Sequence, residues 1–241
     1  MKISASLFKT RTLLATALLL SIASLTQAAD IVTWNTAGNL GTETAEPAAT
    51  VAVGLFGTNL TLGPGITAAA NGNRFGGRNW FDSGDTVAGT TLTESISGND
   101  YIEFIISPDN ATFTATGLRF IFDRSATGPN SLALRSSLDN YANNLAQVTG
   151  LSTTTSTFTS LTFGGVTDVS TATTFRLYGF GATDPDGTGG FDTTSTRTTP
   201  NVVLEGSVTA VPEPSTWIGA GLILGIAGWS QRKRPQGTKA S

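Results

Sequence analysis

The sequence Tyr101-Ile102-Glu103-Phe104-Ile105-Ile106 is followed by the turn-forming residues Ser107-Pro108-Asp109-Asn110 and then by a second apolar run, Thr112 to Phe122. Within the second run Leu118, Phe120 and Phe122 fall on one face, and Arg119, Ile121 and Asp123 on the other. Alternation of this kind is typical of β-strands, because successive side chains point to opposite sides of a strand. These residues predict a strand pair joined by a turn.

Similar short segments recur along the chain, separated by Gly, Asn, Asp and Pro clusters. They are Asp30 to Asn35, Val51 to Phe56, Ser131 to Ser136 with Leu132 and Leu134 inward, Thr157 to Phe163, Thr173 to Phe180 with Phe175 and Leu177 inward, and Asn201 to Val208 with Val202, Leu204 and Val208 inward. Only Leu138 to Ala146 looks helical. The pattern predicts an all-β domain, an antiparallel two-sheet sandwich of jelly-roll type.

Composition excludes several kinds of chemistry. The 241 residues contain no cysteine and no histidine, so disulfides, thiolate metal sites and histidine-assisted catalysis are ruled out. Between Asp30 and Ala210 there are 16 acidic residues and 7 basic ones, all arginine, which gives a formal charge of −9. A body this acidic is a poor partner for nucleic acid, because phosphate binding needs a positive surface.

The N-terminal residues have the features of a secretory signal. Lys2, Lys9 and Arg11 precede an apolar core from Leu13 to Ala23, which is too short for a stable membrane anchor. Small residues before the end of the segment predict cleavage between Ala28 and Ala29, so that residues 1–28 form the signal peptide. The mature protein is therefore expected outside the cytoplasm.

The C-terminal residues combine three features in a fixed order: Pro212-Glu213-Pro214, an apolar run from Trp217 to Trp229, and Arg232-Lys233-Arg234. The two prolines prevent helix formation and hold Glu213 extended. The apolar run predicts a transmembrane helix over about 215–231, with tryptophans at both interfaces and the basic cluster on the cytoplasmic side. This arrangement places residues 29–209 outside the membrane and residues 235–241 in the cytoplasm.

The order of these features, and above all Val211-Pro212-Glu213-Pro214-Ser215-Thr216-Trp217, resembles the PEP-CTERM sorting tail, also catalogued as the ice-binding protein C-terminal domain. The resemblance covers residues 210–234 and implies export through the inner membrane of a Gram-negative bacterium. It also implies that an exosortase-like membrane enzyme recognises Pro212, Glu213 and Pro214, that Arg232, Lys233 and Arg234 form the retention cluster, and that the protein ends at the cell surface or in the extracellular matrix. The catalogue name carries no implication of ice binding.

A second resemblance concerns the body of the chain. The segments Tyr101 to Phe104, Leu134 to Asp139 and Phe175 to Gly179 are similar to those of sandwich domains that often precede such tails. That group has no assigned activity, so the resemblance supports the fold and implies no chemistry.

Two groups of residues are candidates for binding. Trp80, with Trp34 and Phe81, would stack on sugar rings if exposed, and Arg74, Arg78 and Asn79 would then hydrogen-bond sugar hydroxyls. This makes Asn73 to Trp80 the candidate ligand loop. Asp184, Asp186 and Asp192 lie among glycines and resemble the start of a calcium loop, although the bidentate glutamate of such loops is missing. Buried aromatic residues and plain loops explain the same residues without a ligand.

For catalysis the sequence offers Asp82 and Asp85, a carboxylate pair of the kind that glycoside hydrolysis uses, and the separate acidic residues Asp100, Glu103, Asp109 and Asp123. A solvated glycine turn between strands explains this pair better. We therefore expect no catalytic residues, no enzyme activity and no cofactor apart from a possible calcium ion. The expected role is structural or adhesive, beside extracellular polysaccharide or in a biofilm. The alternatives are a carbohydrate-binding module and a carboxylate-based glycan hydrolase.

Overall fold

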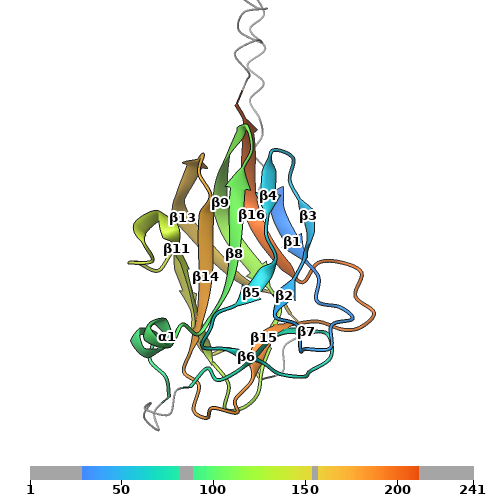
Figure 1. Cartoon of the computed structure of the whole chain (residues 1–241), viewed down its shortest axis with the longest axis vertical. Helices are drawn as coiled ribbons and strands as arrows, with labels where there is room; N and C mark the ends of the chain where they lie inside the picture. The colour runs from blue at the N-terminus through green and yellow to red at the C-terminus, as the bar shows by residue number, and fades with distance from the viewer. Residues whose placement is uncertain (1–28, 82–88, 154–156, 212–241) are drawn as a thin grey trace, which may run out of the picture.

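The computed structural model describes residues 29–81, 89–153 and 157–211, which form three antiparallel sheets (Figure 1). The five-stranded sheet contains, in spatial order, β13 (Thr159–Val169), β9 (Ala111–Phe120), β16 (Val202–Ala210), β1 (Ala29–Trp34) and β3 (Ala48–Val51). The seven-stranded sheet contains β12 (Ala146–Val148), β11 (Ser131–Ser136), β14 (Thr173–Phe180), β8 (Tyr101–Pro108), β5 (Leu60–Leu62) and β2 (Ala45–Glu46), with β4 (Leu55–Gly57) also paired to β8. The four-stranded sheet contains β10 (Phe122–Arg124), β15 (Gly189–Asp192), β7 (Arg74–Arg78) and β6 (Thr67–Ala68). The prediction of an all-β, antiparallel body is confirmed.

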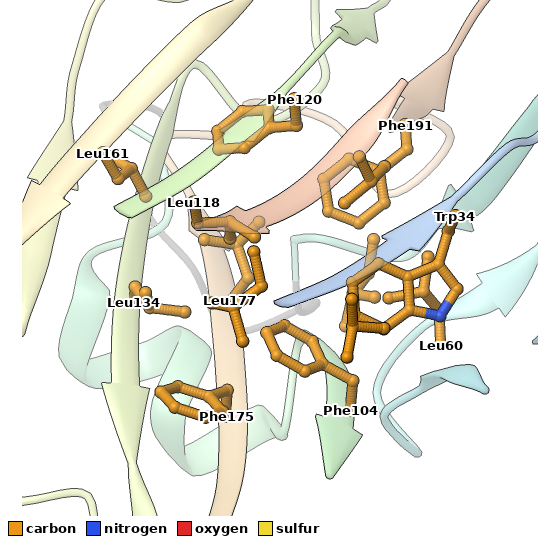
Figure 2. Packing of buried hydrophobic residues seen from close by; sticks show 14 of the residues in the cluster. Trp34, Leu60, Phe104, Leu118, Phe120, Leu134, Leu161, Phe175, Leu177 and Phe191 are labelled. Carbon is orange, nitrogen blue, oxygen red and sulfur yellow. The ribbon is translucent and has the colours of Figure 1, made fainter. Parts of the chain in front are cut away.

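The hydrophobic core lies between the two larger sheets and continues onto the four-stranded sheet, which contributes Phe75, Phe122 and Phe191 (Figure 2). Trp34 of β1 lies with its ring 5.0 Å from that of Phe104 of β8, and Phe104 stacks in turn on Phe175 of β14 at 5.1 Å. The side chains predicted to point inward do so: Leu132, Leu134, Phe175, Leu177, Val202 and Leu204 are all at most 1% exposed. Val208 is only partly buried against the core.

The predicted pairing of the first two strands is wrong. β8 and β9 do follow each other through a turn, in which Asn110 adopts a left-handed backbone with φ of 51°. However, β8 pairs with β14, β4 and β5, whereas β9 pairs with β13 and β16. The turn therefore carries the chain from one large sheet to the other. Each strand buries one apolar face. Because the two sheets face each other, the apolar faces of β8 and β9 lie in the same core.

The segment Leu138 to Ala146 is not a helix. It begins as a single 3-10 turn, Ser137–Asp139, and ends in β12. The carboxylate of Asp139 accepts hydrogen bonds from the backbone N–H groups of Ala142 and Asn143, at 3.3 and 3.0 Å. The next two residues after the 3-10 turn, Asn140 and Tyr141, have left-handed backbones with φ of 59° and 60°, which explains why no helix continues from this turn.

The one α-helix of the described residues, α1 (Leu92–Gly98), was not predicted. Thr91 and Glu94 form a capping box at its start, in which each side chain accepts a hydrogen bond from the other residue's backbone N–H. Asn99 ends the helix with a left-handed φ of 63°. The Thr-x-x-Glu spacing was the sequence signal for this element.

Strand boundaries also differ from the prediction in places. The segment Val51 to Phe56 is divided between β3 and β4 by a turn at Gly54, whose φ is +86°. The segment Thr157 to Phe163 is the first part of a longer strand, β13. The four-stranded sheet was not predicted, because its strands are short and two of them, β7 and β15, contain a pair of glycines.

Both ends of the described body lie at the same end of the molecule. Ala29, the first residue of β1, is paired with Gly206 of β16, and β16 ends at Ala210. The backbone N–H of Val211 then donates to the carbonyl of Asn110, at 2.9 Å, in the turn between β8 and β9. The four-stranded sheet and α1 lie at the opposite end, at the bottom of Figure 1. We refer to these as the tail end and the far end.

Candidate functional site

The candidate ligand loop Asn73 to Trp80 is mostly a strand, β7, at the far end of the molecule. Trp80 is fully buried: its indole N–H donates to the carbonyl of Gly77 at 2.8 Å, and its ring lies over Gly179, where an added Cβ would come within 2.4 Å. Trp34 is also fully buried. These indoles offer no exposed face to a sugar ring, which corrects the expectation of a stacking surface.

Arg74 is likewise buried, and its role in the structure is an ion pair. Its guanidinium donates to Asp123 of β10, lies 4.0 Å from Asp192 of β15, and donates to the hydroxyl of Thr188 at 3.2 Å. Burial raises the pKa of the Asp192 carboxyl, while the backbone N–H of Thr193 and the charge of Arg74 act in the opposite direction. This cluster joins three strands of the four-stranded sheet.

Unlike Arg74 and Trp80, Arg78 is exposed, and it pairs with Asp186 at 3.3 Å on the surface. Asp184 accepts a hydrogen bond from the backbone N–H of Asp186, as in an ordinary Asx turn. The three candidate calcium ligands are thus engaged separately, since Asp192 faces Arg74. Within the described residues no group of three or more acidic side chains is placed to hold a metal ion.

A different cluster gathers all three tyrosines of the chain around one arginine on the outer face of the seven-stranded sheet. The guanidinium of Arg176 lies 4.3 Å from the ring centre of Tyr101 and 4.2 Å from that of Tyr141. Tyr178 packs edge-on against Tyr101 at 5.3 Å. Arg176 also donates to the carboxylate of Glu103 at 2.7 Å. We call these five residues the tyrosine cluster.

Strand register creates this cluster. Tyr101 is paired with Tyr178, and Glu103 with Arg176, in the antiparallel β8 and β14. Arg176 is also paired with Arg135 of β11, so the three segments that carry the second resemblance lie side by side. Residues paired across strands lie on the same face of a sheet, which brings their side chains together.

Tyr141 reaches the cluster from the loop after β11. Its backbone is left-handed, with φ of 60°, and its N–H donates to the carbonyl of Ser136 at 2.9 Å. Its own carbonyl accepts a hydrogen bond from Arg135 at 2.6 Å, and Arg135 also donates to Asn144 at 2.7 Å. Tyr141 remains partly exposed, whereas Tyr101 and Tyr178 are buried.

The cluster favours the neutral phenol of Tyr101 and the charged guanidinium of Arg176. Burial raises the pKa of Tyr101, against the opposing effect of the Arg176 charge. Burial would lower the pKa of Arg176, but its interactions with Glu103, Tyr178, Tyr101 and Tyr141 together outweigh this effect and raise the pKa. The surface therefore combines a partly exposed aromatic ring with a fixed cation and a carboxylate, groups suited to the apolar faces and hydroxyls of sugars.

Several predicted site residues lie outside the described residues. They are Ala28, Asp82, Asp85, Pro212, Glu213, Pro214, Arg232, Lys233 and Arg234. Within residues 29–81, 89–153 and 157–211 no helix is long and apolar enough to cross a membrane. The predicted tail helix is not among these residues.

Comparison with known proteins adds no relatives. No protein-family model matches the chain, and neither the curated proteins nor the solved structures contain a significant match.

Proposed function

We propose that the chain is an exported surface protein of the PEP-CTERM type, held by its tail in the membrane and then processed by an exosortase-like enzyme. The observation that carries this proposal is the order of Pro212-Glu213-Pro214, the apolar run Trp217 to Trp229 and the basic cluster Arg232 to Arg234 behind an N-terminal signal. The role of the body is structural or adhesive, beside extracellular polysaccharide, and needs no enzyme activity.

The described body suits this arrangement. Cleavage between Ala28 and Ala29 would leave β1 whole, since that strand begins at Ala29. The sorting motif begins at Pro212, two residues after β16 ends. Export and anchoring would thus act on segments adjoining the same end of the body. We further propose that the two large sheets form a jelly-roll sandwich, with the four-stranded sheet added at the far end.

The test is a proline double variant in the native host. In the wild type we expect the intact mass of the mature protein to lack the tail, with the protein in the surface or medium fraction. In Pro212→Ala/Pro214→Ala the tail should be retained and the protein should stay in the membrane fraction, because the extended recognition element is lost.

The control is Pro235→Ala, which changes a proline beyond the basic cluster and should be processed like the wild type. A tail that is retained in the wild type as well as in the double variant would contradict the proposal, and would leave a simple membrane-anchored protein.

The tyrosine cluster supports a second candidate function, glycan binding by the body. Tyr141 is a partly exposed ring beside Arg176 and Glu103, and the loop that carries it is fixed by Arg135. Aromatic rings stack on the apolar faces of sugars, and charged groups hydrogen-bond their hydroxyls. This surface replaces the buried Trp80 as the place where a carbohydrate-binding module would act. The hydrolase alternative depends on Asp82 and Asp85, outside the described residues.

Affinity electrophoresis through gels containing the host exopolysaccharide, or a neutral glucan, tests this second function. We expect Tyr141→Ala to weaken retention about tenfold, which corresponds to roughly 1.4 kcal/mol. Tyr141→Phe keeps the ring and should retain most of the binding. Migration of the wild type that no polysaccharide retards would rule the function out.

A further inference from the structure

Large apolar side chains are exposed at the tail end of the body. Val53 is 95% exposed, Phe56 62% and Val211 51%. Isolated exposed apolar residues are common on soluble proteins, but three that meet at one end of a molecule indicate a contact surface. We call Val53, Phe56 and Val211 the apolar tip.

Backbone contacts bring the three residues of the apolar tip together. The turn that carries Val53 is held to the turn between β8 and β9, since the N–H of Asp109 donates to the carbonyl of Gly54 at 2.8 Å. Val211 donates to the next residue of that same turn, Asn110. Phe56 of β4 is paired with Ser107, near the end of β8. In Figure 1 these segments lie at the top, where β16 ends.

The length of chain beyond the body limits how far the apolar tip can lie from a bilayer. Six residues, Val211 to Thr216, separate the last residue of β16 from the apolar run that begins at Trp217. Even fully extended, six residues span only about 20 Å. If the tail is inserted, as the proposed function requires, the tail end of the body must face the membrane surface.

We propose that the apolar tip contacts the lipid surface and seats the body on the outer face of the inner membrane while the tail is uncleaved. Apolar side chains gain free energy when they enter the interfacial region of a bilayer. The formal charge of −9 on the body, together with the exposed Asp109 beside the tip, disfavours anionic lipid and favours a zwitterionic surface. Seating would hold Pro212 to Pro214 close to a membrane-embedded processing enzyme. This inference rests on the proposed function.

A single fluorescent label tests the contact, because the chain has no cysteine of its own. The full chain, purified with its tail, is labelled at Val53→Cys with an environment-sensitive dye and reconstituted into phosphatidylcholine vesicles, with and without a nitroxide-labelled lipid. The matched control is Leu40→Cys. Leu40 is 71% exposed but belongs to the far part of the body, where its carbonyl accepts a hydrogen bond from Asn71. Alkaline extraction of the same samples reports whether the tail is inserted.

We expect the lipid quencher to reduce the emission of the Val53 label at least threefold more than that of the Leu40 label. Equal, weak quenching of the two labels, in samples whose tail resists extraction, would overturn the inference that the apolar tip contacts lipid. It would leave the proposed function intact. A blue shift that depends on protein concentration, without quenching, would assign the tip to a second copy of the chain and also overturn the proposal. A tail that alkali extracts would contradict the proposed function, and it would also contradict the inference about the apolar tip, which requires an inserted tail.

Discussion

Replacing Arg74 with methionine is expected to lower the free energy of unfolding by about 3 kcal/mol. Arg74 is 2% exposed and pairs with Asp123, with Asp192 close by, so the substitution leaves two half-buried carboxylates without a cation. Removing one partner of a buried ion pair costs about 3 to 5 kcal/mol, and we expect the low end because both carboxylates keep some exposure. Urea unfolding followed by far-ultraviolet circular dichroism measures the change.

Arg78→Met is the matched control, since it changes the same residue type in the same strand, β7. The Arg78–Asp186 pair lies on the surface, with the two side chains 50% and 84% exposed. Exposed ion pairs contribute about 0 to 1 kcal/mol, because water screens the charges. If both variants lost a similar free energy of unfolding, burial of the Arg74 ion pair would not determine how much the pair stabilises the fold.

The loss in Arg74→Met should also depend on pH. The pKa of Asp192 is raised in the folded state from its ordinary 3.8, mainly by burial. Its protonated form therefore favours folding, and this contribution is present below 3.8 and is lost as the pH rises through the raised pKa. Without Arg74, which lowers that pKa, the pKa rises further. The difference in stability between wild type and Arg74→Met should therefore be larger at pH 7 than at pH 4.

The strands were predictable from sequence because alternation of apolar residues is a local property. Ile102, Phe104 and Ile106 identify β8 without any knowledge of its neighbours. Its partners were not predictable, because β14 lies far along the chain and strand pairing depends on contacts across the whole body. The turn after β8 suggested a hairpin. In the structure this turn joins β8 to β9, which belongs to the facing sheet, and the residues of a turn do not distinguish these two kinds of connection.

The candidate sites show the same limit. Trp80 follows the Phe75-Gly76-Gly77 part of β7, where glycines interrupt the alternation that would show which side chains point inward. Its burial depends on β14, which lies much further along the chain and places Gly179 beneath the indole. The tyrosine cluster was missed for a related reason: Tyr101 and Tyr178 meet through strand register, and Tyr141 through a left-handed loop residue. Neither relation is visible in the spacing of the residues.

Trp34→Ala should be the most destabilising single substitution of those considered, with an expected loss of about 3 to 5 kcal/mol. Trp34 is fully buried where β1 faces β8, and its ring lies 5.0 Å from that of Phe104 (Figure 2). Its indole N–H donates to the carbonyl of Thr58 at 3.2 Å. The substitution opens a cavity between the two large sheets and removes that hydrogen bond. Circular dichroism during urea unfolding again gives the free energy, without depending on the tryptophan removed.

A loss of this size approaches the total stability of many domains, so Trp34→Phe supplies a second measurement on a variant that stays folded. It keeps a ring against Phe104 and should cost only about 1 to 2 kcal/mol.

Leu40→Ala, at a side chain that is 71% exposed, should change stability by less than about 0.5 kcal/mol. If Trp34→Ala cost no more than Leu40→Ala, the contact between Trp34 and Phe104 would not hold the two sheets together. The order expected from burial is Trp34→Ala, then Trp34→Phe, then Leu40→Ala, since each step removes less apolar surface from the core between the sheets.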